Sequence, residues 1–165
     1  MLRYLAPLAL LLLLSAGSLP IATAELTGPV AIISNEIDRP TAERLRSSLE
    51  AMGFQVAIFP PEMLGEALNY AQFIIILGGH RAPGVGELVA PLLSGEERSN
   101  LERRGYAYYF IKTRWGKPVI IIAGNDRFGT YRAANNFLIR GIRELRAIMQ
   151  SPGVALVLVP APMGG

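Results

Sequence analysis

The residues of this chain that could do chemistry lie in three loops, each of which follows an apolar segment. The chain has only two aspartates, Asp38 and Asp126, and one histidine, His80. Each aspartate is followed by an arginine and stands just before a segment with helical periodicity. Two carboxyl groups in one cleft could bind a polar ligand, or act as a general acid and a general base.

The same residues also have a structural interpretation. Aspartate or asparagine at a helix start accepts hydrogen bonds from free amides and opposes the positive end of the helix dipole. The arginines in these loops could pair with the carboxylates as a rigid polar cluster. We favour this role, because caps are common and binding sites are few per protein. The candidate ligand-binding residues are Asn35, Asp38, His80, Arg81, Asn125, Asp126, Arg127 and Thr130.

Several familiar kinds of site are not supported. The segment 124–130 has the glycine spacing of a phosphate-binding loop, but Gly129 stands where the essential lysine would be. A single histidine in a chain without cysteine cannot build a zinc site. No Gly-x-Ser-x-Gly nucleophile motif occurs. We therefore expect no metal and no cofactor, assign no catalytic residue, and favour a role other than that of an enzyme.

The elements that must position these loops are predicted by two periodicities. Four apolar segments predict strands, at Pro29–Ile33, Gln55–Phe59, Phe73–Leu77 and Val119–Ala123. Three of them are fully apolar, which is typical of parallel strands buried on both faces. Helical patterns run from Thr41 to Met52, from the capping box of Ser94 and Glu97 to Gly105, and from Thr130 to Met149.

The aromatic segment Tyr106–Thr113 and its short connection to the next strand predict an antiparallel hairpin. Its alternating aromatic side chains are expected in the core, whereas Trp115 is expected to be exposed. Together these elements predict a three-layer α/β sandwich of flavodoxin-like or Rossmann-like type, mostly parallel with one antiparallel hairpin strand. Residues 152–165 are expected to form an edge strand at Val154–Val159 and a mobile tail.

The first 24 residues have the pattern of a secretory signal peptide. Arg3 precedes the apolar run Leu8–Leu14, which is followed by helix breakers and by the small residues Ala22-Thr23-Ala24. We expect one mature domain, residues 25–165, located outside the cytoplasm and either secreted or associated with the cell surface. Retention of the leader as a membrane anchor is the alternative.

Composition narrows the classes of partner. The absence of cysteine excludes disulfides, thiolate metal sites and a cysteine nucleophile. The formal charge of +3 falls to +2 without Arg3, and no basic run exceeds two residues, so we do not expect nucleic acid as a partner. Four arginines on the polar side of the last helix, which could grip an anionic glycan or lipid surface, are Arg132, Arg140, Arg143 and Arg146.

Three sequence blocks together resemble a family of archaeal surface-layer (S-layer) and related cell-envelope domains. They are Val30–Asp38, Phe73–Gly79 with Gly84–Val89, and Val119–Thr130. The resemblance implies an exported α/β domain, largely without established activity, that associates with envelope or S-layer components. His80 departs from it, since the family usually has proline there. The hairpin and the turn after it also resemble non-catalytic accessory domains of glycoside hydrolases, which implies binding near glycans.

Two hypotheses from different classes follow. The first is a non-enzymatic cell-envelope domain that acts by association with surface components. The second is a small extracytoplasmic glycan-binding or ligand-binding domain, or a hydrolase, that uses Asp38 and Asp126 in a cleft at the sheet's C-terminal edge. The surroundings of the two carboxyl groups distinguish them.

Overall fold

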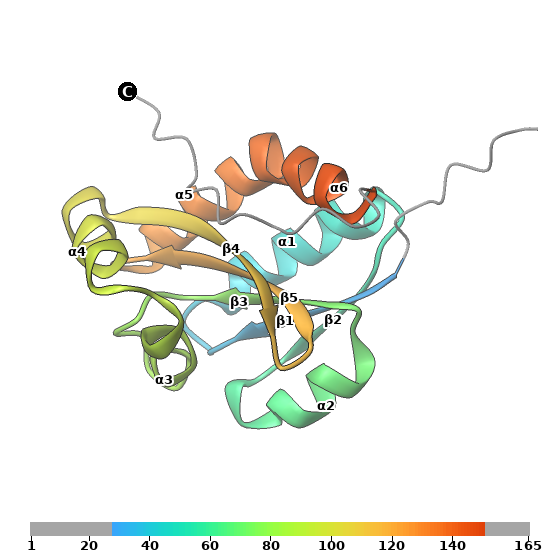
Figure 1. The fold of residues 1–165 in the computed structure, drawn as a ribbon, viewed down its shortest axis with the longest axis horizontal. Helices are drawn as coiled ribbons and strands as arrows, with labels where there is room; N and C mark the ends of the chain where they lie inside the picture. The colour runs from blue at the N-terminus through green and yellow to red at the C-terminus, as the bar shows by residue number, and fades with distance from the viewer. Residues whose placement is uncertain (1–27, 151–165) are drawn as a thin grey trace, which may run out of the picture.

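A computed structural model describes residues 28–150 as a five-stranded sheet with helices on both faces (Figure 1). The strand order is β2-β1-β3-β5-β4, in which only the β4–β5 pair is antiparallel. The strands are β1 (Pro29–Ser34), β2 (Gln55–Phe59), β3 (Phe73–Leu77), β4 (Tyr106–Arg114) and β5 (Lys117–Gly124). The predicted three-layer α/β architecture with one antiparallel strand is confirmed, whereas the finer flavodoxin-like or Rossmann-like label stays a prediction.

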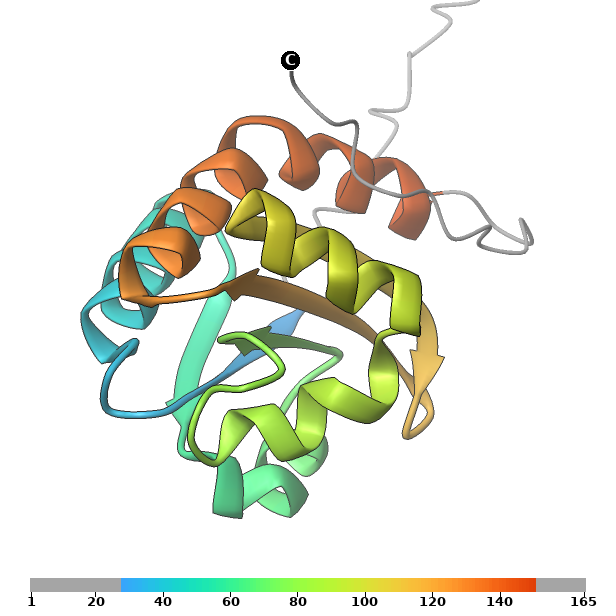
Figure 2. The same ribbon diagram turned by 90° about the vertical axis from the view of Figure 1, so that its left-hand side faces the viewer.

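The helices form the two outer layers (Figures 1 and 2). The bounds are α1 (Arg39–Ala51), α2 (Leu64–Tyr70), α3 (Val85–Val89), α4 (Gly95–Arg104), α5 (Arg127–Asn136) and α6 (Ile142–Gln150). Helices α1, α5 and α6 cover one face of the sheet, where side chains such as Leu45 and Phe137 pack on alternate strand residues. Helices α2, α3 and α4 cover the other face through side chains such as Val85 and Leu101.

The central strands are apolar throughout because both of their faces are covered. In β1 and β3, successive residues such as Ile32 and Ile33 point to opposite core clusters, and both are fully buried. The register pairs Ile33 with Ile76, and Ile76 lies next to Ile121 of β5 through the following parallel ladder. The carboxyl ends of β1, β3 and β5 therefore finish at one edge of the sheet, where ligands bind in open α/β sheets.

The hairpin between β4 and β5 closes through Trp115 and Gly116, which have φ of 52° and 76°. Two successive positive φ angles are typical of the tight turn that joins antiparallel strands. Tyr108 and Phe110 lie in the core as predicted. The expectation for Trp115 is wrong in part, because its ring is half-buried against the neighbouring core cluster and stacks with the Arg114 guanidinium.

The last helical segment is interrupted where the sequence predicts continuous helix. It consists of α5, one π-helical turn over Phe137–Gly141, and α6. The wider turn places both Phe137 and Gly141 in the interior, next to the ring of Tyr108. The expected α4 is confirmed with its capping box and with Gly105 as its left-handed C-cap.

Among residues 28–150 no helix is long and apolar enough to cross a membrane. The predicted leader, residues 1–24, and the predicted strand Val154–Val159 both lie outside the described residues.

Candidate functional site

The loops after β1, β3 and β5 meet around a pocket of about 330 Å³ at the carboxyl edge of the sheet. All eight candidate residues from the sequence line it: Asn35, Asp38, His80, Arg81, Asn125, Asp126, Arg127 and Thr130. The carboxyl edge of the sheet therefore brings together residues that are up to 95 positions apart in the chain. The contacts of each side chain indicate whether it holds the fold together or is placed to bind a ligand.

Glycines let the loops approach closely enough to form the floor of the pocket. A Cβ atom on Gly79 would collide with the Gly124 carbonyl oxygen, and one on Gly124 would collide with the backbone of α5. Gly86 is packed as closely, since a Cβ atom added to it would lie 2.7 Å from the His80 carbonyl oxygen. These contacts are backbone to backbone, so a larger residue cannot be accommodated by a rotamer change.

Two asparagines tie the loops together. The Asn35 Nδ2 donates to the Pro83 carbonyl at 3.0 Å, while its Oδ1 accepts from the Asp38 amide at 3.0 Å. The Asn125 Nδ2 donates to the Glu102 carbonyl at 2.9 Å. Both side chains thus hold backbone from a different loop or helix, which fixes the shape of the pocket wall.

Asp126 is a helix cap, as the structural interpretation predicts. Its Oδ1 accepts a hydrogen bond from the Gly129 amide at 2.7 Å, at the N-terminus of α5. The Thr130 hydroxyl donates to the Asp126 carbonyl at 3.1 Å. A carboxylate at this position is stabilised in its charged form by the helix amides and by the positive end of the helix dipole.

Asp38 differs from Asp126 although it occupies the same position in the sequence pattern. It is the N-cap residue of α1 but makes no side-chain cap hydrogen bond. Asp38 is 4 % exposed, and its buried Oδ1 has no hydrogen-bond partner among the described residues. A buried polar atom without a partner is costly, and its persistence calls for an explanation.

The environment of Asp38 favours its neutral form. Burial raises the pKa of the carboxyl above 3.8, the neighbouring Thr130 hydroxyl partly offsets this, and the negative charge of Asp126 raises it further. The two aspartates therefore lie in different environments, since Asp126 is exposed and accepts a helix amide, whereas Asp38 is buried and pushed towards protonation. Such a difference between adjacent carboxyl groups is typical of functional sites.

His80 is oriented by a residue that the sequence argument missed. Its Nε2 lies 3.0 Å from Oε1 of Glu102 on α4, and its buried Nδ1 has no partner among residues 28–150. Arg81 makes an ion pair with the same Glu102 oxygen at 2.6 Å. The sequence identifies α4 as a polar capped helix, but nothing local in it places Glu102 over the loop after β3.

The predicted pairing of arginines with the aspartates is wrong. Arg39 pairs with Glu43 along α1 at 3.1 Å, and Arg81 pairs with Glu102. Arg127 lies with its guanidinium 4.8 Å from the ring centroid of Phe128, which is 64 % exposed. No ion pair to Asp38 or Asp126 is present within the described residues. Neither carboxyl group is therefore neutralised by a basic side chain of the described residues.

The described residues hold no group of three or more histidine, cysteine or acidic side chains that could bind a metal ion. The comparisons with known proteins add no assignment. No protein-family model, no curated protein and no solved structure matches the chain. The pocket is therefore the basis for inferring the function.

Proposed function

We propose that the protein is an exported binding domain whose pocket takes a neutral, hydroxyl-rich ligand such as a sugar unit. The observation that carries the proposal is the buried Asp38 carboxyl, which lines the pocket and keeps one oxygen without a partner. That oxygen is closed to solvent in the fold, so a ligand group would supply its missing hydrogen bond by displacing part of the pocket wall. The export part of the proposal depends on the leader pattern in residues 1–24.

The pocket needs hydrogen-bond donors from its ligand. In the neutral tautomer that carries its proton on Nε2, towards the Glu102 carboxylate, the unpartnered Nδ1 of His80 is an acceptor. The buried Oδ1 of Asp38 is an acceptor whenever the carboxyl is ionised.

The balance of charge favours a neutral ligand over an ion. Asp38, Asp126 and Glu102 line the pocket together with Arg81 and Arg127. The N-termini of α1 and α5 add partial positive charge at Asp38 and Asp126. An anion would meet the carboxyl groups and a cation would meet the arginines and helix ends, whereas a polyhydroxyl compound needs neither charge.

The rim of the pocket adds apolar surface next to the polar groups. Ile37 lines the pocket and is exposed, and the lining residue Arg127 stacks with the exposed ring of Phe128. Polar groups with apolar surface beside them suit sugar rings, which carry both hydroxyl groups and apolar C–H faces. This accords with the expected association with envelope glycans, and association with S-layer components remains part of the proposal.

A hydrolytic activity is the second candidate, and one observation favours it. Asp38 is buried and pushed towards its protonated form, as a general acid requires, while Asp126 is an exposed carboxyl group that lines the same pocket. We rank binding first because the Asp126 Oδ1 already accepts the Gly129 amide at 2.7 Å.

The experiment is a ligand screen by thermal shift and saturation-transfer NMR on the chain from Glu25, with a panel of neutral, acidic and amino sugars. We expect saturable binding of at least one neutral sugar, weakened in Asp38→Asn and abolished in Asp38→Ala. The matched control is Gly65→Ala on α2, a helix that contributes no residue to the pocket, where the added Cβ meets no neighbour; it should change stability without changing affinity. Binding only of charged sugars, or equal affinity in Asp38→Ala, would contradict the proposal.

A further inference from the structure

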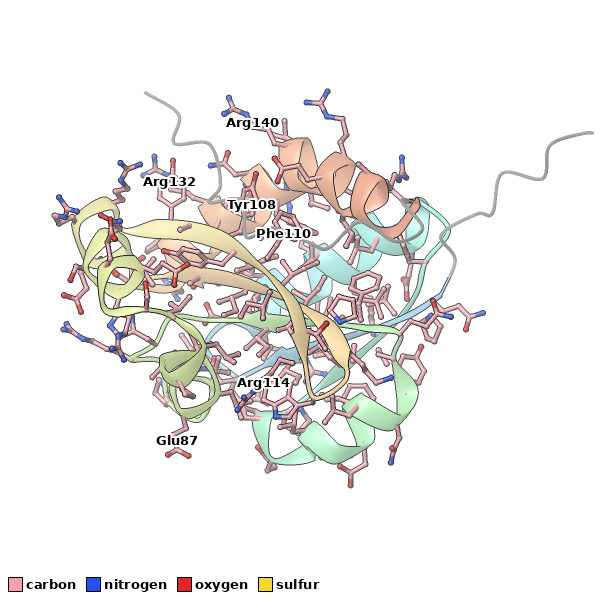
Figure 3. The ribbon with its side chains drawn as sticks, in the orientation of Figure 1. Glu87, Tyr108, Phe110, Arg114, Arg132 and Arg140 are labelled. Atoms are coloured by element: carbon pink, nitrogen blue, oxygen red, sulfur yellow. The ribbon has the colours of Figure 1, made fainter. Side chains whose placement is uncertain are left out.

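The outer face of α5 and α6 carries a row of arginines that is independent of the pocket. We call Arg132, Arg140, Arg143 and Arg146 the arginine row. All four are exposed, and they span about 20 Å along the helical segment at its usual rise per residue. Figure 3 shows Arg132 and Arg140 on the side of α5 and α6, whereas Glu87 lies on the opposite side of the molecule. The Arg132 guanidinium lies 4.6 Å from the ring centroid of Tyr106 in β4, which orients it without neutralising its charge.

The charge of the row is not neutralised by neighbouring side chains. None of its members makes an ion pair within residues 28–150. Glu144 is the only carboxylate in segment 127–150, and it is half-buried. Burial raises its pKa and the charge of Arg143 lowers it, which places Glu144 near Arg143 without cancelling the other members. By contrast, Arg39 and Arg46 on α1 pair with glutamates.

An apolar side chain stands in the middle of this basic face. Ile139 is 66 % exposed, more than any other large apolar residue of the described chain. It lies in the π-helical turn next to Arg140. The buried residues Phe137 and Gly141 within the same turn hold that turn against the core. Ile139 is therefore presented on a supported backbone and not on a loose end.

We propose that the arginine row and Ile139 form a docking surface for an anionic lipid bilayer. Guanidinium groups bind phosphate oxygens with paired hydrogen bonds, and a row of them follows a plane of headgroups. An exposed isoleucine between them can enter the boundary between headgroups and acyl chains. A soluble polyanion such as duplex DNA would match the charges but offers no favourable place for Ile139.

The orientation leaves the pocket accessible. The arginine row lies on α5 and α6, on the side of the molecule where Figure 3 labels Arg132 and Arg140, whereas the residues that line the pocket come from the carboxyl edge of the sheet, from α4 and from the start of α5. A domain docked through this face could therefore bind a membrane and a pocket ligand at once. The inference does not depend on the identity of that ligand.

The test is co-sedimentation with vesicles of phosphatidylcholine alone and of phosphatidylcholine mixed with phosphatidylglycerol. The chain should start at Glu25, because the apolar run Leu8–Leu14 would bind vesicles by itself. It retains every described element and both core clusters. We expect binding to the anionic vesicles only, with an affinity that falls as salt rises.

The variants separate this surface from net charge. The double substitution R140Q/R143Q should lower the partition coefficient about 25-fold, at about fivefold per arginine. The matched control R103Q/R104Q removes two exposed arginines from α4 and should change it less than about twofold. Ile139→Ala should weaken the binding that persists at higher salt, where charge is screened.

Three results would overturn the proposal. One is equal binding to neutral and anionic vesicles, or binding to neither. Another is an equal loss in R140Q/R143Q and R103Q/R104Q, which would indicate only net charge. The third is tighter binding to duplex DNA than to vesicles together with no effect of Ile139→Ala, which would favour a nucleic-acid partner. Circular dichroism of each variant should match the parent before partition is compared.

Discussion

Replacing Asp38 with asparagine should stabilise the protein at neutral pH, contrary to the usual effect of changing a buried polar residue. The carboxyl is 4 % exposed, has an unpartnered oxygen, and makes no cap hydrogen bond to lose. Its backbone amide, which donates to Asn35, is unchanged by the substitution. Asparagine has almost the same shape but carries no charge that burial would penalise.

The size of the effect follows from the penalty on a buried polar group without a partner, about 1–3 kcal/mol. The amide keeps some of that polarity, so we expect Asp38→Asn to raise the free energy of unfolding by about 1 kcal/mol. That corresponds to an increase of about 4 °C in Tm for a domain of this size. Stabilisation by removal of a polar group is typical of sites that are retained for function.

The sign of the pH dependence is fixed by the direction of the pKa shift. The folded-state pKa of Asp38 lies above its unfolded value near 3.8. Asp38 therefore contributes stability that is fully present below that unfolded pKa and is lost as pH rises through the folded one. The advantage of Asp38→Asn should be small in acid, grow through this window and level off above it.

Urea unfolding of the parent and the variant across this pH range is the assay, with Asp126→Asn as the matched control. The Asp126 carboxylate caps α5 and is stabilised by the helix dipole, so Asp126→Asn should lower the free energy of unfolding by about 0.5 kcal/mol at neutral pH. The two isosteric changes should thus have opposite signs. If Asp38→Asn destabilises the protein as Asp126→Asn does, the Asp38 carboxylate is satisfied in the fold and the reasoning is refuted.

Three further predictions concern the pocket floor, a helix cap and a buried phenol. Gly79→Ala should cost about 1–3 kcal/mol and weaken pocket binding, since its Cβ meets the Gly124 carbonyl; urea unfolding and the sugar titration check both effects. Ser94→Ala should cost about 1 kcal/mol in urea unfolding by removing the α4 capping box, and an unchanged midpoint would contradict this. Burial raises the pKa of Tyr109 to about 12, so its contribution to stability is present below about pH 10 and lost as pH rises through 12. Spectrophotometric titration of Tyr109→Phe should remove the last tyrosinate step, and loss of an earlier step would refute the assignment.

The sequence predicts the central strands well because they are buried on both faces. The segment Phe73–Leu77 has the same bounds in the structure as in the prediction, as does Gln55–Phe59, which forms the partly buried edge strand β2. Their continuous apolar character leaves no competing periodicity. The π-helical turn over Phe137–Gly141 was not predicted, because it depends on how Phe137 and Gly141 pack against Tyr108 rather than on local propensity.

The candidate residues gather as predicted, but the partners of their side chains do not follow from spacing. Asp38 and Asp126 look alike in the sequence, since each precedes an arginine and a helix. Only Asp126 reaches a helix amide. Glu102 was missed because α4 reaches the loop after β3 only through the packing of a whole layer. These differences arise from tertiary packing, so no local sequence pattern predicts them.

The measurement that tests the central claim most directly is chemical-shift mapping of the chain from Glu25 with the neutral sugar that binds best in the screen. The account predicts saturable shifts of the amides around Asp38, His80 and Thr130, and their absence in Asp38→Ala with its fold intact. Saturable shifts confined to other surfaces, or no sugar-dependent shift at the pocket, would contradict the assignment of this pocket as the binding site.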